Sequence, residues 1–117
     1  MERPLADRAL HFTLGPDGGA LIDAALLARG GRSARTLVKD GPLRVTLVAL
    51  AAGGIIAPHH ADGPITVQVL AGEIHFRAGG DAWTLGRGEL LALAAGVEHQ
   101  VESESGGTFL LTVAAGG

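Results

Sequence analysis

The stretch Gly53-Gly-Ile-Ile-Ala-Pro-His-His-Ala-Asp-Gly-Pro-Ile-Thr-Val-Gln-Val-Leu-Ala-Gly72 decides the fold, because it holds a polar loop with two histidines between two apolar runs. The run before it, Leu43 to Ala51, is nearly all apolar, as expected for a strand covered on both faces. The run Ile65 to Ala71 has the length of a second strand. His59 and His60 are therefore predicted to lie in a loop that joins two strands.

Further β-type runs follow one another at close spacing, separated by glycine-bearing turns. The predicted strands are Ala9 to Leu14, Ser33 to Lys39, Leu43 to Ala51, Ile65 to Ala71, Glu73 to Ala78, Asp81 to Leu85, Glu89 to Ala94, Val97 to Ser103 and Thr108 to Ala114. Gly72 is predicted to turn the chain between the fourth and fifth of them. Eight or nine short strands are typical of a β-sandwich or a small barrel.

One short helix is predicted near the N-terminus, over Ala20 to Ala28, where the apolar residues fall on one helical face. Asp17 is placed to cap its start, and Gly30 with Gly31 to end it. We therefore divide the chain into an N-terminal arm, residues 1–32, and a β-barrel domain, residues 33–117.

The composition excludes several classes of protein. The 117 residues suit one domain, and 47% apolar against 18% charged residues argue against a disordered chain. The net charge is −3 and the nine Lys and Arg are scattered, so we predict no nucleic-acid partner. No apolar run approaches a membrane span, and the first residues lack an apolar signal core, so we expect a cytoplasmic protein with no membrane partner. The absence of cysteine removes thiolate ligands and disulfides.

The stretch from Gly53 to Gly72 resembles the first motif of the cupin family, G-(x)5-H-x-H-(x)3-E-(x)6-G. Gly53, His59 and Gly72 fall on motif positions. Ala61 stands where the motif has its second His, and Ile65 stands where it has Glu.

The stretch from Gly88 to Ser103 resembles the second cupin motif, G-(x)5-P-x-G-(x)2-H-(x)3-N. Gly88, Gly96 and His99 match it, whereas Ala94 replaces Pro and Ser103 replaces Asn. The resemblance covers about 45–113 and implies an all-β jelly roll, a double-stranded β-helix barrel. Cupins of this size are commonly dimers, so the resemblance implies a homodimer, as does the two-sided apolar run from Leu43 to Leu50.

In metal-binding cupins the two motifs supply three His and one Glu around Zn, Fe, Mn, Ni or Cu. By motif position His59 and His99 are the metal candidates here, and Ala61 and Ile65 bring no donor atom. Two imidazoles are fewer than the three protein ligands of a catalytic zinc site. The simplest structural explanation of the pair is two pocket histidines hydrogen-bonded to backbone or water.

Three further residues are weaker metal candidates: His60, His75 and Asp62. His60 adjoins His59, so on a regular strand the two point to opposite faces, and an exposed loop position explains it simply. His75 shares a face with Glu73 and Arg77, opposite Ile74 and Phe76, so we expect it to point outward. Glu98 adjoins His99 and is expected to face away from it.

These observations predict a small stand-alone cupin that binds a small organic ligand in its barrel, with a degenerate or weak metal site. Ile65, Val67 and Val69 are expected to line the pocket together with His59 and His99. The alternative is a metal-dependent enzyme of dioxygenase or isomerase type that recruits a further ligand. A third class is the sensor-type cupin of transcription regulators, but this sequence has no room for a helix-turn-helix, so a role on DNA would need a separate partner.

Overall fold

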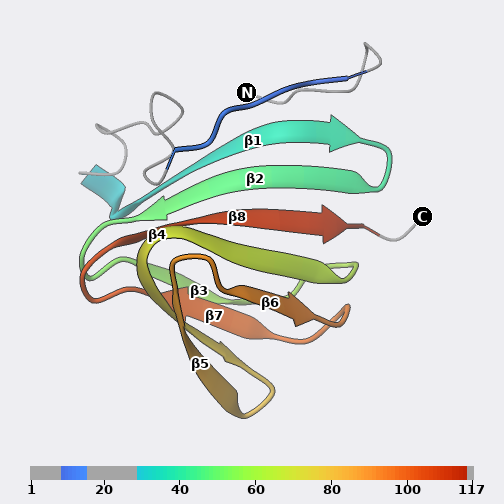
Figure 1. The fold of residues 1–117 in the computed structure, drawn as a ribbon. Coiled ribbons are helices and arrows are strands. Elements are labelled where there is room, and N and C mark those ends of the chain that lie inside the picture. Colours follow the sequence, from blue (N-terminus) through green and yellow to red (C-terminus); the bar gives the residue numbers. More distant parts are fainter. Residues whose placement is uncertain (1–8, 16–28, 116–117) are drawn as a thin grey trace.

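The computed structural model describes residues 9–15 and 29–115, and within them the chain forms eight β-strands (Figure 1). The strands are β1 (Arg32–Asp40), β2 (Leu43–Leu50), β3 (Ile55–His59), β4 (Ile65–Ala78), β5 (Asp81–Gly86), β6 (Leu90–Leu93), β7 (His99–Glu102) and β8 (Gly107–Ala114). The all-β prediction is confirmed. The helix predicted over Ala20 to Ala28 lies outside the described residues. Within the described ranges, no helix has the length and apolar character needed to cross a membrane.

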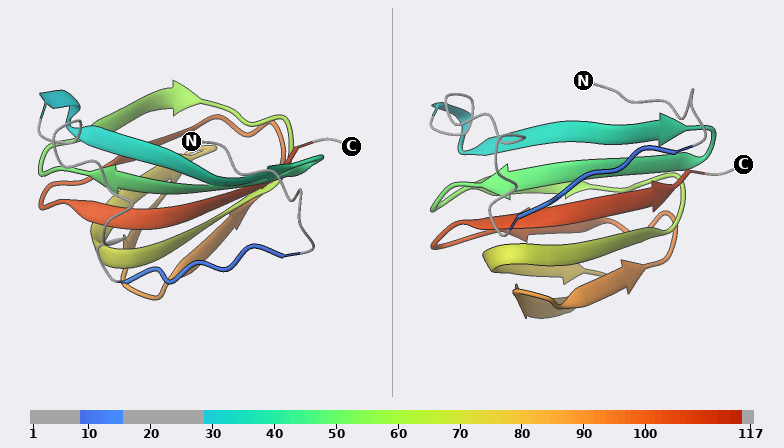
Figure 2. Two further views of the ribbon diagram at one scale, coloured as in Figure 1. Left: turned by 90° about the horizontal axis from the view of Figure 1, so that it is seen from above. Right: turned by 45° about the horizontal axis from the view of Figure 1, so that its top comes forward.

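The strands form one curled antiparallel sheet in the order β1-β2-β8-β4-β7-β3, and β5 and β6 each pair with β4. The first half of β4 pairs with β8 and β6, and its second half pairs with β7 and β5. The sheet therefore folds over on itself along β4 and encloses an apolar interior (Figures 1 and 2).

The turn predicted at Gly72 was wrong, because β4 runs without interruption for 14 residues. Gly72 has a φ of 72°, and the pairing of β4 with β8 shifts register between Val69 and Ala71. A glycine in the left-handed region beside a β-bulge bends a strand without reversing it. This bend carries β4 from one half of the sheet to the other.

The loop predicted around His59 was also partly wrong. Residues 55–59 form β3, an edge strand that pairs with β7, and His59 lies opposite His99 in the register. Pro58 lacks a backbone N–H, which an edge strand tolerates. His60 follows the end of the strand.

The strand predicted over Ala9 to Leu14 was wrong, although its alternating pattern has a structural consequence. Leu10, Phe12 and Leu14 pack against a second apolar cluster that includes Leu37 and Leu47. Figure 2 shows this segment along the face of the sheet that is turned away from β3 and β7. The segment thus partly buries alternate side chains without joining the sheet as a strand.

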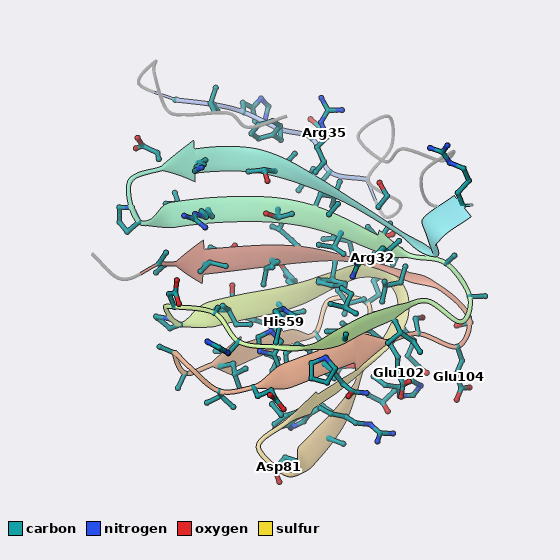
Figure 3. The ribbon with its side chains drawn as sticks, turned by 180° about the vertical axis from the view of Figure 1, so that it is seen from behind. Arg32, Arg35, His59, Asp81, Glu102 and Glu104 are labelled. Atoms are coloured by element: carbon teal, nitrogen blue, oxygen red, sulfur yellow. The ribbon has the colours of Figure 1, made fainter. Side chains whose placement is uncertain are left out.

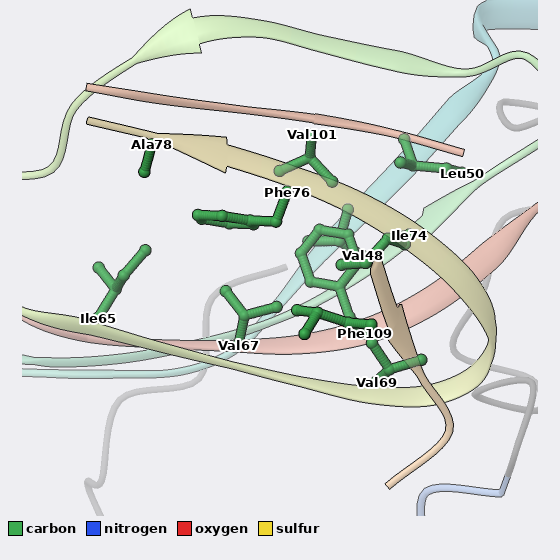
Figure 4. Close-up of a cluster of buried hydrophobic side chains, with 11 residues drawn as sticks. Val48, Leu50, Ile65, Val67, Val69, Ile74, Phe76, Ala78, Val101 and Phe109 are labelled. Atoms are coloured by element: carbon green, nitrogen blue, oxygen red, sulfur yellow. The ribbon is translucent and has the colours of Figure 1, made fainter. Parts of the chain in front are cut away.

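The main core fills the interior of the folded sheet (Figure 4). Its buried members are Val48, Leu50, Ile65, Val67, Val69, Ile74, Phe76, Ala78, Leu85, Val101 and Phe109. The prediction that the run from Leu43 is covered on both faces holds only for the second half of β2, where Val48 belongs to this core and Leu47 to the second cluster; the first residues of the strand are exposed. The chain itself supplies part of that cover, so burial of β2 does not require a partner. The homodimer and the cytoplasmic location stay predictions.

Ser103, which stands at the Asn position of the second motif, joins three segments of the sheet. It is 2% exposed, and its Oγ donates to the Glu73 carbonyl at 2.5 Å and accepts from the Gly106 N–H at 2.9 Å. Its backbone N–H donates to the Gly54 carbonyl, and its carbonyl accepts from the Gly53 N–H. The residue therefore has a structural role at the end of β7.

Replacing Ser103 by Ala is expected to lower the free energy of unfolding by about 1–2 kcal/mol, since a carbonyl and an N–H in part-buried hydrogen bonds each lose a partner. Urea denaturation measures this loss. The control is Ser105→Ala, an exposed position where a change within about 0.5 kcal/mol is expected. Equal stability of the two variants would contradict the assigned role of Ser103.

Candidate functional site

His59, labelled in Figure 3, and His99 come together at the rim of the barrel, where β3 ends and β7 begins. Their ring centroids lie 4.2 Å apart, and the ring planes meet at 60°. His99 is 5% exposed, whereas His59 is exposed. The antiparallel register explains the pairing, because directly opposed residues project to the same face of a sheet.

Both imidazoles are oriented by the same kind of backbone hydrogen bond. Nδ1 of His59 lies 2.9 Å from the Ala57 carbonyl oxygen, and Nδ1 of His99 lies 3.0 Å from the Val97 carbonyl oxygen. A carbonyl oxygen can only accept, so each Nδ1 carries the hydrogen. In the neutral ring, Nε2 is then an acceptor with a free lone pair.

His99 is held from the interior by an aromatic ring. The Phe76 ring stacks on it with centroids 5.3 Å apart and planes within 12°. Burial lowers the pKa of His99 below its ordinary 6.5, and the charges of His59 and His60 lower it further, while the hydrogen bond to Val97 acts in the opposite direction. The buried ring is thereby favoured in its neutral form.

This lowered pKa predicts that acid destabilises the protein through His99. The unfolded chain binds a proton at His99 near pH 6.5, and the folded chain binds it only at lower pH. The stability that neutral His99 contributes is therefore fully present above about pH 6.5, and it is lost as the pH falls through the lower pKa of the folded protein. We expect the urea midpoint to fall between about pH 7.5 and pH 5, and to fall less in His99→Gln, which does not titrate. An identical fall in both proteins would contradict the assignment.

A cavity of about 340 Å³ borders His99. We call it the His99 cavity, and it is lined by Pro58, Arg77, Ala78, Gly79, Gly80, Asp81, Ala82, Glu98, His99 and Gln100. These residues come from the strand ends at one rim of the barrel and from the turn between β4 and β5. The cavity therefore places charged and amide groups beside a buried imidazole.

The remaining metal candidates are not all brought to this place. His60 is exposed and close enough to His99 to affect its charge, and Asp62 is exposed. His75 lies on the face opposite Ile74 and Phe76, which are buried in the core, and its Nδ1 lies 3.1 Å from the Thr84 hydroxyl.

The apolar residues expected in the pocket lie in the packed core. Ile65, Val67 and Val69 are 3%, 1% and 1% exposed, and none of them lines the His99 cavity. Figure 4 shows them across the interior from Phe76 and Val101. The space next to the imidazoles is therefore more polar than the sequence predicted.

The donor set does not fit a metal centre with three protein ligands. Across residues 9–15 and 29–115, no three His, Cys, Asp or Glu side chains come together in a way that could hold a metal ion. His59 and His99 present two imidazoles with available Nε2 atoms, and the other motif positions are Ala61 and Ile65.

Sequence reasoning missed Arg77, Asp81 and Gln100 as lining residues. The Gly79-Gly80 turn was a signal that Asp81 lies close to Ala78. The register that sets Gln100 beside Arg77 on β7 and β4 joins distant parts of the chain, and no local pattern reports it.

A family model described as "Cupin domain" matches residues 46–114. The structure is similar to an RmlC-like cupin from Shewanella frigidimarina, with 20% identity, a TM-score of 0.73, and coverage of 92% of this chain and 93% of that chain. A cupin 2 conserved barrel domain protein from Leptotrichia buccalis is 29% identical, with a TM-score of 0.69 and coverage of 73% and 41% of the two chains.

The structure is also similar to salicylate 1,2-dioxygenase from Pseudoaminobacter salicylatoxidans in complex with gentisate. The identity is 19%, the TM-score is 0.70, and the match covers 77% of this chain and 29% of that chain. At this identity the likeness concerns the fold alone. No curated protein matches the sequence.

Proposed function

The chain belongs to the cupin family, and from this premise we propose that it binds a small organic ligand in the His99 cavity, without a tightly held transition metal. The observation that carries the proposal is the oriented pair of imidazoles, His59 and His99, whose Nδ1 atoms are engaged by backbone carbonyls. The Nε2 atom of His99 is left to contact a ligand in the cavity, while His59 packs against the His99 ring and does not line the cavity.

The dimensions and lining of the cavity support this proposal. Its volume of about 340 Å³ falls within the range of small-molecule sites. A buried imidazole held by Phe76 and Val97 gives a fixed polar contact, and fixed contacts cost little entropy when a ligand binds. Gln100 and Arg77 add polar groups at the wall.

A metal-dependent enzyme of dioxygenase or isomerase type is the second candidate. The free Nε2 atoms favour it, because a backbone hydrogen bond at Nδ1 is the usual way in which a protein orients a metal-binding histidine. A bound metal would supply Lewis-acid or redox chemistry. This candidate needs a third donor beyond the two imidazoles, which is why we rank it second.

A fragment screen by amide NMR on ¹⁵N-labelled protein tests the leading proposal. We expect fragments that bind to shift the amides of Ala78 to Gly80 and Glu98 to Gln100, and to bind more weakly to His99→Gln. Glu104→Gln, at an exposed position outside the cavity lining, is the matched control and should bind them normally. The proposal is refuted if the fragments gather instead in the apolar cavity lined by Pro64 and Thr112.

A further inference from the structure

Several of the groups around the His99 cavity that lack a partner are hydrogen-bond acceptors. His99 uses its Nδ1 hydrogen on the Val97 carbonyl, which leaves Nε2 able only to accept. Within the described residues, Nε2 has no hydrogen-bond partner, and no buried side-chain nitrogen or oxygen atom lacks one. Nε2 of this 95%-buried residue therefore reaches open space, and His99 lines the cavity.

Two exposed acidic residues line the cavity together with His99. Asp81 follows the turn between β4 and β5, and Glu98 precedes His99. Figure 3 shows Asp81 at the tip of its hairpin. In the part of the chain that the structure describes, neither carboxylate takes part in an ion pair.

Arg77 is the positively charged residue at the cavity wall, and it is paired with a carboxylate that lies outside the cavity. The Arg77 guanidinium lies 3.5 Å from the Glu102 carboxylate, which does not line the cavity. Asp81 and Glu98 remain as unmatched negative groups, so the cavity has a negative balance. The negative charge and the free acceptor at Nε2 both favour a ligand that is positively charged and donates hydrogen bonds.

A bare metal ion does not fit these acceptors. The described residues hold no group of three His, Asp or Glu side chains close enough together to bind one. The three acceptors therefore do not converge on one point, and a donor carried on an organic framework suits the cavity better than a bare ion.

We propose that the His99 cavity selects a small organic cation, of which a primary amine in its ammonium form is the simplest. This inference rests on the proposed function and names the ligand class for the same site. An ammonium group is positively charged and donates N–H hydrogen bonds, so it suits a cavity that offers the free acceptor of His99 and is lined by the acidic residues Asp81 and Glu98, whichever of them it contacts directly. A framework of one small ring or short chain is in keeping with a cavity of about 340 Å³.

Three probes of one shape test the charge preference: benzylammonium, benzyl alcohol and benzoate, each titrated into ¹⁵N-labelled full-length protein. We expect benzylammonium to shift the amides of Ala78 to Asp81 and Glu98 to Gln100. We expect it to bind about tenfold more tightly than benzyl alcohol, and benzoate to bind most weakly.

Variants that remove one negative charge each test which residues produce the preference for a cation. Asp81→Asn and Glu98→Gln should each weaken benzylammonium about fivefold and leave benzyl alcohol unchanged. Glu104→Gln removes the same charge elsewhere on the surface and is the control (Figure 3). A uniform loss in all three variants would reduce the effect to net charge and overturn the inference.

Other outcomes separate this inference from the proposed function. If benzyl alcohol or benzoate shifts the same amides as strongly as benzylammonium, the cavity is a ligand site without cation selectivity, and only the inference fails. If none of the probes shifts these amides, the inference also fails, and the fragment screen alone then decides the proposed function.

Discussion

Replacing Phe76 by Ala lowers the free energy of unfolding by about 3–5 kcal/mol, which is the largest loss we expect from one side chain. Phe76 is 1% exposed, lies in the main core, and stacks on the His99 ring. Its loss leaves a void that the surrounding strands cannot fill without shifting. Urea denaturation measures the loss, and a fall in melting temperature of at least about 10 °C accompanies it.

The control for Phe76 is Ile55→Ala, because Ile55 is 57% exposed on an edge strand. Its loss should cost less than about 1 kcal/mol. Phe76→Leu should recover part of the stability, since it restores most of the volume but not the stacked ring. A small effect of Phe76→Ala, close to that of Ile55→Ala, would mean that the interior is not packed as described.

Replacing Gly72 by Ala lowers the free energy of unfolding by more than about 2 kcal/mol. The backbone of Gly72 has a φ of 72°, which side chains other than glycine adopt at a cost. A Cβ atom there would also overlap the Gly106 carbonyl oxygen, so the bend of β4 would have to open. Thermal and urea unfolding measure the effect.

Gly41→Ala separates the cost of the left-handed backbone from the cost of the overlap with Gly106. Gly41 has a φ of 54°, and a Cβ atom there meets nothing within 4 Å, so only the backbone cost of about 1 kcal/mol applies. The difference between the two variants measures the overlap at the bend. Equal losses at Gly72 and Gly41 would show that the bend of β4 does not depend on the close approach to Gly106.

Local pattern predicted much of the fold. The alternation around Ile74, His75 and Phe76 gave the correct faces, because a strand turns successive side chains to opposite sides. The motif spacing brought attention to His59 and His99, which the structure pairs across β3 and β7.

The errors arose where local pattern has two structural outcomes. Gly72 was read as a turn, but a left-handed glycine serves a bend in a continuous strand equally well. Residues 9–14 alternate like a strand, yet the same alternation suits an extended segment whose apolar side chains pack on a sheet without pairing. The short β3 was hidden by Pro58 and by the adjacent histidines.

The polar wall of the His99 cavity could not be predicted because it depends on pairing between distant strands. Arg77 lies beside Gln100 only through the register of β4 with β7. Ile65, Val67 and Val69 belong to the packed core, and Ile65 also borders a separate apolar cavity. The sequence pattern predicts which side chains point inward, but it does not predict whether they fill the interior or line an open cavity.

The measurement that tests the central claim most directly is the metal content of tag-free protein by mass spectrometry, as isolated and after loading with Zn, Fe, Mn, Ni or Cu and desalting. Two imidazoles without a third protein ligand predict that only traces of metal survive desalting. A stoichiometric transition metal that is retained in the native protein, and lost when His59 is replaced by Ala and His99 by Gln, would contradict the account and favour the metal-dependent enzyme.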